Sequence, residues 1–501
     1  MLSQTAPSKF KSPISLQPTL AWTAILGLFG FTALCILAQA GGILRLAYPA
    51  GAFLVGAFLY VRYPILYLGF TWWVAFLSPL IRRLVDYQSG WVDPSPVLLA
   101  PFLVIMVTTL TLIRKLPRAA QIGGLPLVLS MMGVTYGYLV GILKQNPTSA
   151  TVALLNWLAP ILLAFHLLVH WRDYPRYRQN LQRVFIWGVL VTGAYGVFQY
   201  LVAPQWDRFW LVNTGLLAFG RPEPLGMRVF STMNSPGPFA TVMMAGLLLL
   251  FSSQSIIRFP AVAVGYLSFL LSMVRSAWLG WVVGVLTFIP SLKPRLQVRL
   301  VITVMVMAIC VIPVINLEPF ASTISARLQT FTNASKDVSY NDRITGYTEI
   351  LGEALAEVPG EGLGYFIKSD SLGANDSGIL SMFFYLGWFG TIPYLSGIAL
   401  MFFSLFQSTV GRSDSFMSAA RAISLGVFAQ VGLGSATAAL SGIVMWSFAG
   451  VALAAQKYYN YQRMKAISAQ SISSQLERVV NHENPVSGSE RTTRWRGTLP
   501  D

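Results

Sequence analysis

A succession of apolar runs, separated by polar connections, constrains this chain more than any other feature. The runs cover residues 20–37, 49–60, 64–79, 97–113, 125–142, 151–169, 184–202, 236–251, 259–273, 277–289, 300–315, 377–406, 417–433 and 436–454. A helix perpendicular to the bilayer needs about 20 apolar residues, and several runs are shorter. We therefore predict an all-α polytopic membrane protein with about 12–14 transmembrane helices.

Composition favours the same class. The 501 residues are 54% hydrophobic and 11% charged, whereas soluble domains carry about a quarter charged residues. In a soluble protein the net charge of +16 would indicate nucleic-acid binding. Here the cations lie largely at the ends of apolar runs and in the two tails, so we read them as a topology signal and expect no nucleic-acid partner.

The positive-inside rule favours a cytoplasmic N-terminus and C-terminus. This orientation puts most basic clusters on the cytoplasmic side: Arg114, Lys115, Arg118, Arg172, Arg176, Arg178, Arg183, Lys293, Arg295, Arg299, Arg412, Lys457, Arg463 and Lys465. Arg82 and Arg83 fall outside and contradict the scheme locally. The first three spans are therefore its weakest part.

The ends of the chain differ from its apolar middle. We predict a cytoplasmic N-terminal tail at 1–19, a transmembrane domain at 20–456 and a disordered cytoplasmic tail at 457–501. Lys9 and Lys11 before the first run, and the Ala-Gln-Ala sequence at 38–40 after it, are typical of a cleaved signal peptide. The run is longer than a usual signal sequence and further spans follow at once, so a retained helix is favoured over cleavage.

Two outer-face connections are long, at 203–234 and 316–376. The second contains an expected amphipathic helix with apolar residues at helical spacing and Glu349, Glu353 and Glu357 on another face. A capping pattern at Ser339 and Asp342 begins this helix, and the Pro359-Gly360 pair ends it.

Three arginines at or near the outer surface are the candidates for chemistry. Arg228 precedes a turn-rich start to the next span, Arg275 separates two half-length apolar runs, and Arg343 begins the amphipathic helix. A guanidinium near a membrane is costly unless it pairs or binds an anion, and its planar fork fits diphosphate oxygens. The alternative is that each side chain extends to lipid headgroups. Because no nucleotide-binding or metal-binding motif occurs, we expect no cofactor and no metal.

The order of these elements resembles the O-antigen ligase and O-antigen or exopolysaccharide polymerase superfamily. The matching elements are the Arg-x-Phe-Ser-x-x-Asn-Ser-Pro segment at Arg228, the Ser-x-x-Arg-Ser-Ala-Trp segment at Arg275, the second outer loop with Arg343 and its Pro-Gly-x-Gly-Leu-Gly sequence, and the Leu-Gly-Trp-Phe-Gly span. The resemblance covers about 185–406 and implies a GT-C-like fold.

In that family, membrane enzymes transfer a glycan from undecaprenyl diphosphate to a sugar hydroxyl at the outer leaflet, without metal or nucleotide sugar. Carried onto this chain, Arg228 and Arg275 match arginines thought to hold the donor diphosphate, and Arg343 matches the loop arginine. Further expected substrate contacts are Arg221, Asn234 and Asn375. The family's usual His-Asn pair is replaced by Asn375-Asp376. Asp376 becomes the candidate base, or equally an N-cap of the following helix.

The resemblance implies a multi-pass protein of the bacterial inner membrane whose active site faces outward. The expected partners are an undecaprenyl diphosphate-linked glycan, an acceptor glycan or glycolipid, membrane lipids, and polysaccharide assembly and chain-length proteins. The missing histidine tilts the prediction toward polymerisation of exopolysaccharide or O-antigen. The alternatives are an O-antigen ligase acting on lipid A core, a transporter or flippase of lipid-linked saccharide, and a non-catalytic scaffold.

Overall fold

The computed structural model describes residues 19–291, 294, 297–298, 301, 350–367, 377–407 and 414–483. No strand occurs in these ranges. Their helices are α1 (Thr19–Leu37), α2 (Gly41–Arg62), α3 (Pro64–Ser89), η1 (Pro96–Leu99), α4 (Ala100–Met106), α5 (Thr109–Lys115), η2 (Leu116–Arg118), α6 (Ala119–Ile122), α7 (Leu125–Lys144), α8 (Pro147–Val169), η3 (Trp171–Asp173), α9 (Tyr174–Val202), α10 (Gln205–Thr214), η4 (Leu217–Phe219), α11 (Pro236–Leu250), α12 (Arg258–Leu271), α13 (Arg275–Phe288), η5 (Ile289–Ser291), α18 (Gly378–Gln407), α19 (Ser415–Phe428) and α20 (Ala439–Glu483).

Length and hydropathy identify the molecule as a polytopic membrane protein. In the described ranges, nine helical stretches are long and apolar enough to cross a membrane, and three further apolar helices of 10–17 residues accompany them. Every apolar run predicted within these ranges is helical. The run at 300–315 lies outside the described residues, apart from residue 301.

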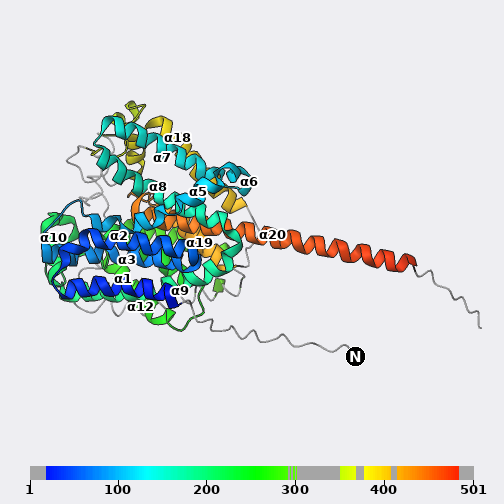
Figure 1. Ribbon diagram of the computed structural model, residues 1–501, viewed down its shortest axis with the longest axis horizontal. Helices are drawn as coiled ribbons and strands as arrows, with labels where there is room; N and C mark the ends of the chain where they lie inside the picture. The colour runs from blue at the N-terminus through cyan, green and yellow to red at the C-terminus, as the bar shows by residue number, and fades with distance from the viewer. Residues whose placement is uncertain are drawn as a thin grey trace, which may run out of the picture.

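Successive helices run up and down between two ends of a bundle (Figure 1). One end of the bundle, where α3 and α9 finish, is called the loop end here. Helices α8, α11, α13, α18 and α20 begin at this end. The opposite end, from which the C-terminal half of α20 projects, is the tail end. The helices pack mainly in pairs, α7 with α18, α8 with α20, α9 with α12 and α13 with α19.

Two predicted boundaries are wrong. Helix α3 continues ten residues beyond the predicted end at 79, through Arg82, Arg83 and Asp86. These charges do not end the helix because they are paired inside the protein. Helix α20 runs to Glu483, so the tail predicted to be disordered from 457 is helical as far as 483. Its sequence has no Gly or Pro between Gly450 and Pro485 to stop it. Residues 1–18 and 484–501 lie outside the described ranges.

The described part of the second long loop is held between α7 and α18. Residues 350–356 are helical and end just before Pro359-Gly360, as predicted. Ile350 and Ala354 are buried against Leu380 and Phe384 of α18. The apolar residues predicted to line the buried face also include Leu351, Leu355 and Val358. These three side chains are instead exposed, because this short helix buries only one narrow stripe.

The Pro-Gly-x-Gly-Leu-Gly sequence fixes the end of that loop. The Leu363 amide donates to the Gly137 carbonyl (2.9 Å), and the Glu361 amide donates to the Phe384 carbonyl (2.7 Å). Gly362 has φ of 86°, and a Cβ on it would lie 2.3 Å from the Gly141 nitrogen. A side chain is therefore excluded both by backbone conformation and by space.

Candidate functional site

Arg228 is anchored to the turn that leads into α13. Its Nε donates to the Ser272 carbonyl and its Nη2 to the Met273 carbonyl, each at 3.2 Å. The Val229 amide donates to the Leu271 carbonyl (3.1 Å), which aligns the chain at 228–229 with the end of α12. Arg275 is the first residue of α13 and lies two residues beyond Met273. The structure thus brings the regions of these two predicted arginines together.

The helices that flank the α12–α13 turn are each shorter than the thickness of a bilayer core. Each of these helices has 14 residues, a length of about 21 Å, against about 30 Å for the hydrocarbon core. The N-terminus of α13 adds backbone N–H groups, which favour anions. Two arginines and a helix N-terminus therefore occur in the same region, a combination suited to a negatively charged group.

A buried polar network holds the connection between Arg228 and α11. Arg83 Nη1 donates to Asp207 Oδ1 (2.7 Å), and Arg83 Nη2 donates to the Ser231 carbonyl. Gln199 Nε2 donates to Asp207 Oδ2 (2.8 Å), and its Oε1 accepts from the Phe230 and Ser231 amides (3.0 and 2.8 Å). The network stabilises Ser231 at φ 51°, a conformation that non-glycine residues rarely adopt.

Asp207 depends on its partners to remain charged. Burial raises the pKa of its carboxyl, and the Arg83 guanidinium together with hydrogen bonds from Gln199 and Tyr195 acts in the opposite direction. An isolated carboxylate in such a place would take up a proton. The ion pair with Arg83 therefore maintains the hydrogen bonds that shape the connection.

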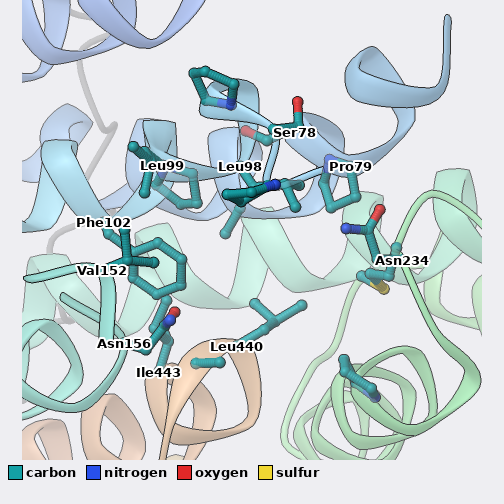
Figure 2. A pocket seen from close by; sticks show the side chains of 18 of the residues that line it. Ser78, Pro79, Leu98, Leu99, Phe102, Val152, Asn156, Asn234, Leu440 and Ile443 are labelled. Carbon is teal, nitrogen blue, oxygen red and sulfur yellow. The ribbon is translucent and has the colours of Figure 1, made fainter. Parts of the chain in front are cut away.

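The same connection forms part of the wall of a cavity of about 440 Å³. The cavity lies between α3, η1, α4, α8, the start of α11 and the start of α20, and it is lined mostly by apolar and proline side chains. Asn234 and Asn156 lie on different walls (Figure 2). Asn234 Oδ1 and Ser95 Oγ are buried atoms that have no hydrogen-bond partner in the described structure. The cavity can therefore accept an apolar group.

Arg221 is the predicted contact that lies apart from this arrangement. It occupies an exposed turn, where its Nη1 is 3.6 Å from Glu223 Oε1. An isolated β-bridge between Gly220 and Met227 closes this turn just before Arg228. Arg343, Asn375 and Asp376 lie outside the described residues, so their proposed placement stays a prediction.

Sequence reasoning missed Arg83, Asp207 and Gln199 as residues that shape the site. A signal existed in Arg82 and Arg83, whose position contradicted the charge pattern expected for their side of the membrane. The structure explains the exception. Arg82 pairs with Asp86 (3.1 Å) and Asp93 (3.0 Å), and Arg83 pairs with Asp207, so neither is an unpaired surface cation.

Comparison with known protein families and with curated proteins found no match for this chain.

Proposed function

We propose that this protein is a polysaccharide polymerase or ligase-like glycosyltransferase. It takes a glycan from undecaprenyl diphosphate and transfers it to a sugar hydroxyl at the outer leaflet, with polymerisation of exopolysaccharide or O-antigen favoured over ligation to lipid A core. The observation that carries the proposal is the 228–238 connection. It joins Arg228, bonded to the turn before Arg275, to the wall of a largely apolar cavity.

The proposed reaction needs little beyond positioning and charge stabilisation. The acceptor hydroxyl attacks the anomeric carbon, the bond from that carbon to the diphosphate oxygen breaks, and the configuration inverts. Arg228 and Arg275 would stabilise the negative charge that grows on the departing diphosphate. Asp376 is the candidate to accept the hydroxyl proton, and Arg343 is the candidate to bind the donor from the loop.

The distribution of charge supports an outward-facing site in the bacterial inner membrane. Many cations of the described chain lie at the tail end, among them Arg114, Lys115, Arg118, Arg172, Arg176 and Arg178. At the loop end, Arg82, Arg83 and Lys144 pair with carboxylates. By the positive-inside rule the tail end is cytoplasmic, which puts the loop end on the outer face.

A deletion strain tests the proposal against its alternatives. We expect loss of long surface glycan and accumulation of single lipid-linked units on the outer leaflet. Units trapped on the inner leaflet would instead identify a flippase. Normal glycan length would contradict any role in polymerisation, and a missing link to lipid A core with intact polymer would identify a ligase.

A further inference from the structure

A second cavity, of about 230 Å³, lies between α1, α3 and α9 near the tail end. Its walls carry Trp22, Trp73 and Trp187 together with Leu66 and Phe70. Two polar residues of α9, Asn180 and Arg183, also line it. Leu66 lies in the first turn of α3, and Arg183 lies in the third turn of α9. The cavity is thus at the depth where lipid headgroups meet acyl chains.

The two polar residues of the cavity make no hydrogen bond or ion pair with the part of the chain that the structure describes. Neighbouring arginines on α9 are paired, Arg176 with Asp173 (3.7 Å) and Arg178 with Asp414 (3.3 Å). Arg183, by contrast, makes no hydrogen bond or ion pair with the described residues. Asn180 Oδ1 is buried and also has no partner there. Arg183 therefore offers a guanidinium donor at this cavity.

Gly69 makes room for the Asn180 amide. A Cβ at position 69 would lie 3.0 Å from Asn180 Oδ1 and 3.3 Å from Val184 Cγ2, tighter than ordinary contact. The absence of a side chain on α3 therefore lets the amide lie against the helix backbone and keeps the cavity open. The tryptophan rings are amphipathic and suit the boundary between headgroups and acyl chains.

We propose that this cavity binds the headgroup region of an anionic phospholipid. Arg183 donates to the lipid phosphate. The tryptophans contact the start of an acyl chain. The cavity is too small for a whole phospholipid, so the remainder of the lipid stays in the bilayer. Basic pockets between transmembrane helices commonly bind anionic headgroups. This site is separate from the cavity of about 440 Å³ lined by Asn234, which we call the loop-end cavity. It does not depend on the proposed function.

The test is native mass spectrometry of the full chain, released from micelles that contain equal amounts of phosphatidylglycerol and phosphatidylcholine. The wild type is expected to retain phosphatidylglycerol in preference. Arg183→Gln should lower that retention about fivefold, the equivalent of about 1 kcal/mol for one arginine near a membrane surface.

Arg114→Gln is the matched control because Arg114 is an exposed cation at the same end that does not line the cavity. It should retain lipid like the wild type, and excess inorganic phosphate should not displace the lipid. Equal retention of the two lipids by the wild type would overturn the proposal. So would equal losses in Arg183→Gln and Arg114→Gln, or displacement by phosphate alone, which would indicate a simple anion site.

Discussion

Arg83 on α3 and Asp207 on α10 form a fully buried ion pair, with 2.7 Å between Nη1 and Oδ1, although 124 residues separate them in sequence. Arg83 also stacks on the Phe230 ring, with its guanidinium carbon 4.9 Å from the ring centroid. The pair therefore ties α3 and α10 to the connection that carries Arg228. A change in either residue should alter the proposed donor site without touching the substrate.

Removing one partner of this pair should destabilise the protein strongly. Arg83→Ala leaves the Asp207 charge buried, which costs about 3–5 kcal/mol in comparable pairs. Thermal unfolding in detergent should show a large fall in the unfolding midpoint. The double variant Arg83→Met/Asp207→Leu should recover part of it, because it removes the unpaired charge but leaves Gln199 Nε2 and the Ser231 carbonyl without these partners. Arg221→Ala breaks an exposed pair and should cost under about 1 kcal/mol. Equal stability of Arg83→Ala and Arg221→Ala would contradict this account.

Gly362→Ala should weaken the packing of the described part of the second long loop, residues 350–367. The φ of 86° disfavours any side chain, and the new methyl would meet the Gly141 backbone. Together, strain and crowding should destabilise this region by at least about 2 kcal/mol, measured as faster proteolysis within 350–367.

Gly352→Ala provides the matched control for that experiment. Gly352 lies in a helix, and nothing is within 4 Å of the position that its Cβ would take. Alanine there should stabilise the helix by about 0.5–1 kcal/mol. If both alanine variants resist protease like the wild type, the loop is not held by the Gly362–Gly141 contact.

Filling the loop-end cavity should impair transfer more than folding. Val152→Phe places a larger side chain from α8 in the wall of the cavity that Asn234 also lines, and we expect transfer to fall about tenfold. Leu143→Phe adds a similar ring at an exposed position on α7 and should leave transfer unchanged. Rates with extracted lipid-linked saccharide, compared at equal amounts of folded protein, measure the difference. Full activity in Val152→Phe would remove this cavity from the proposed donor site.

Hydropathy predicted the helices because a bilayer leaves the backbone few other structures. The predicted and observed bounds agree within two residues at α1 and α7, whereas α8 begins four residues before the predicted start at 151. Hydropathy failed at the end of α3, where charge suggested a loop. The neutralising Asp207 comes from a segment 124 residues away, and no linear pattern shows that pairing.

The site was predictable to a similar extent. The position of Arg275 between two short apolar runs indicated a residue at membrane depth, and the structure places it at the start of a 14-residue helix. The cavity beside Asn234 was not foreseen, because its walls come from separate segments spread between Ala75 and Ile443. Such a cavity follows from three-dimensional packing, which neither motif order nor hydropathy describes.

The most direct test of the central claim is a reconstituted transfer reaction. Lipid-linked saccharide extracted from the deletion strain would be incubated with the purified protein, and the products sized by mass spectrometry. The wild type should lengthen the glycan and release undecaprenyl diphosphate. Arg275→Ala and Arg343→Ala should be slower by about 100-fold or more, while still inserting into membranes. Normal lengthening by both variants, or none by the folded wild type, would contradict the account.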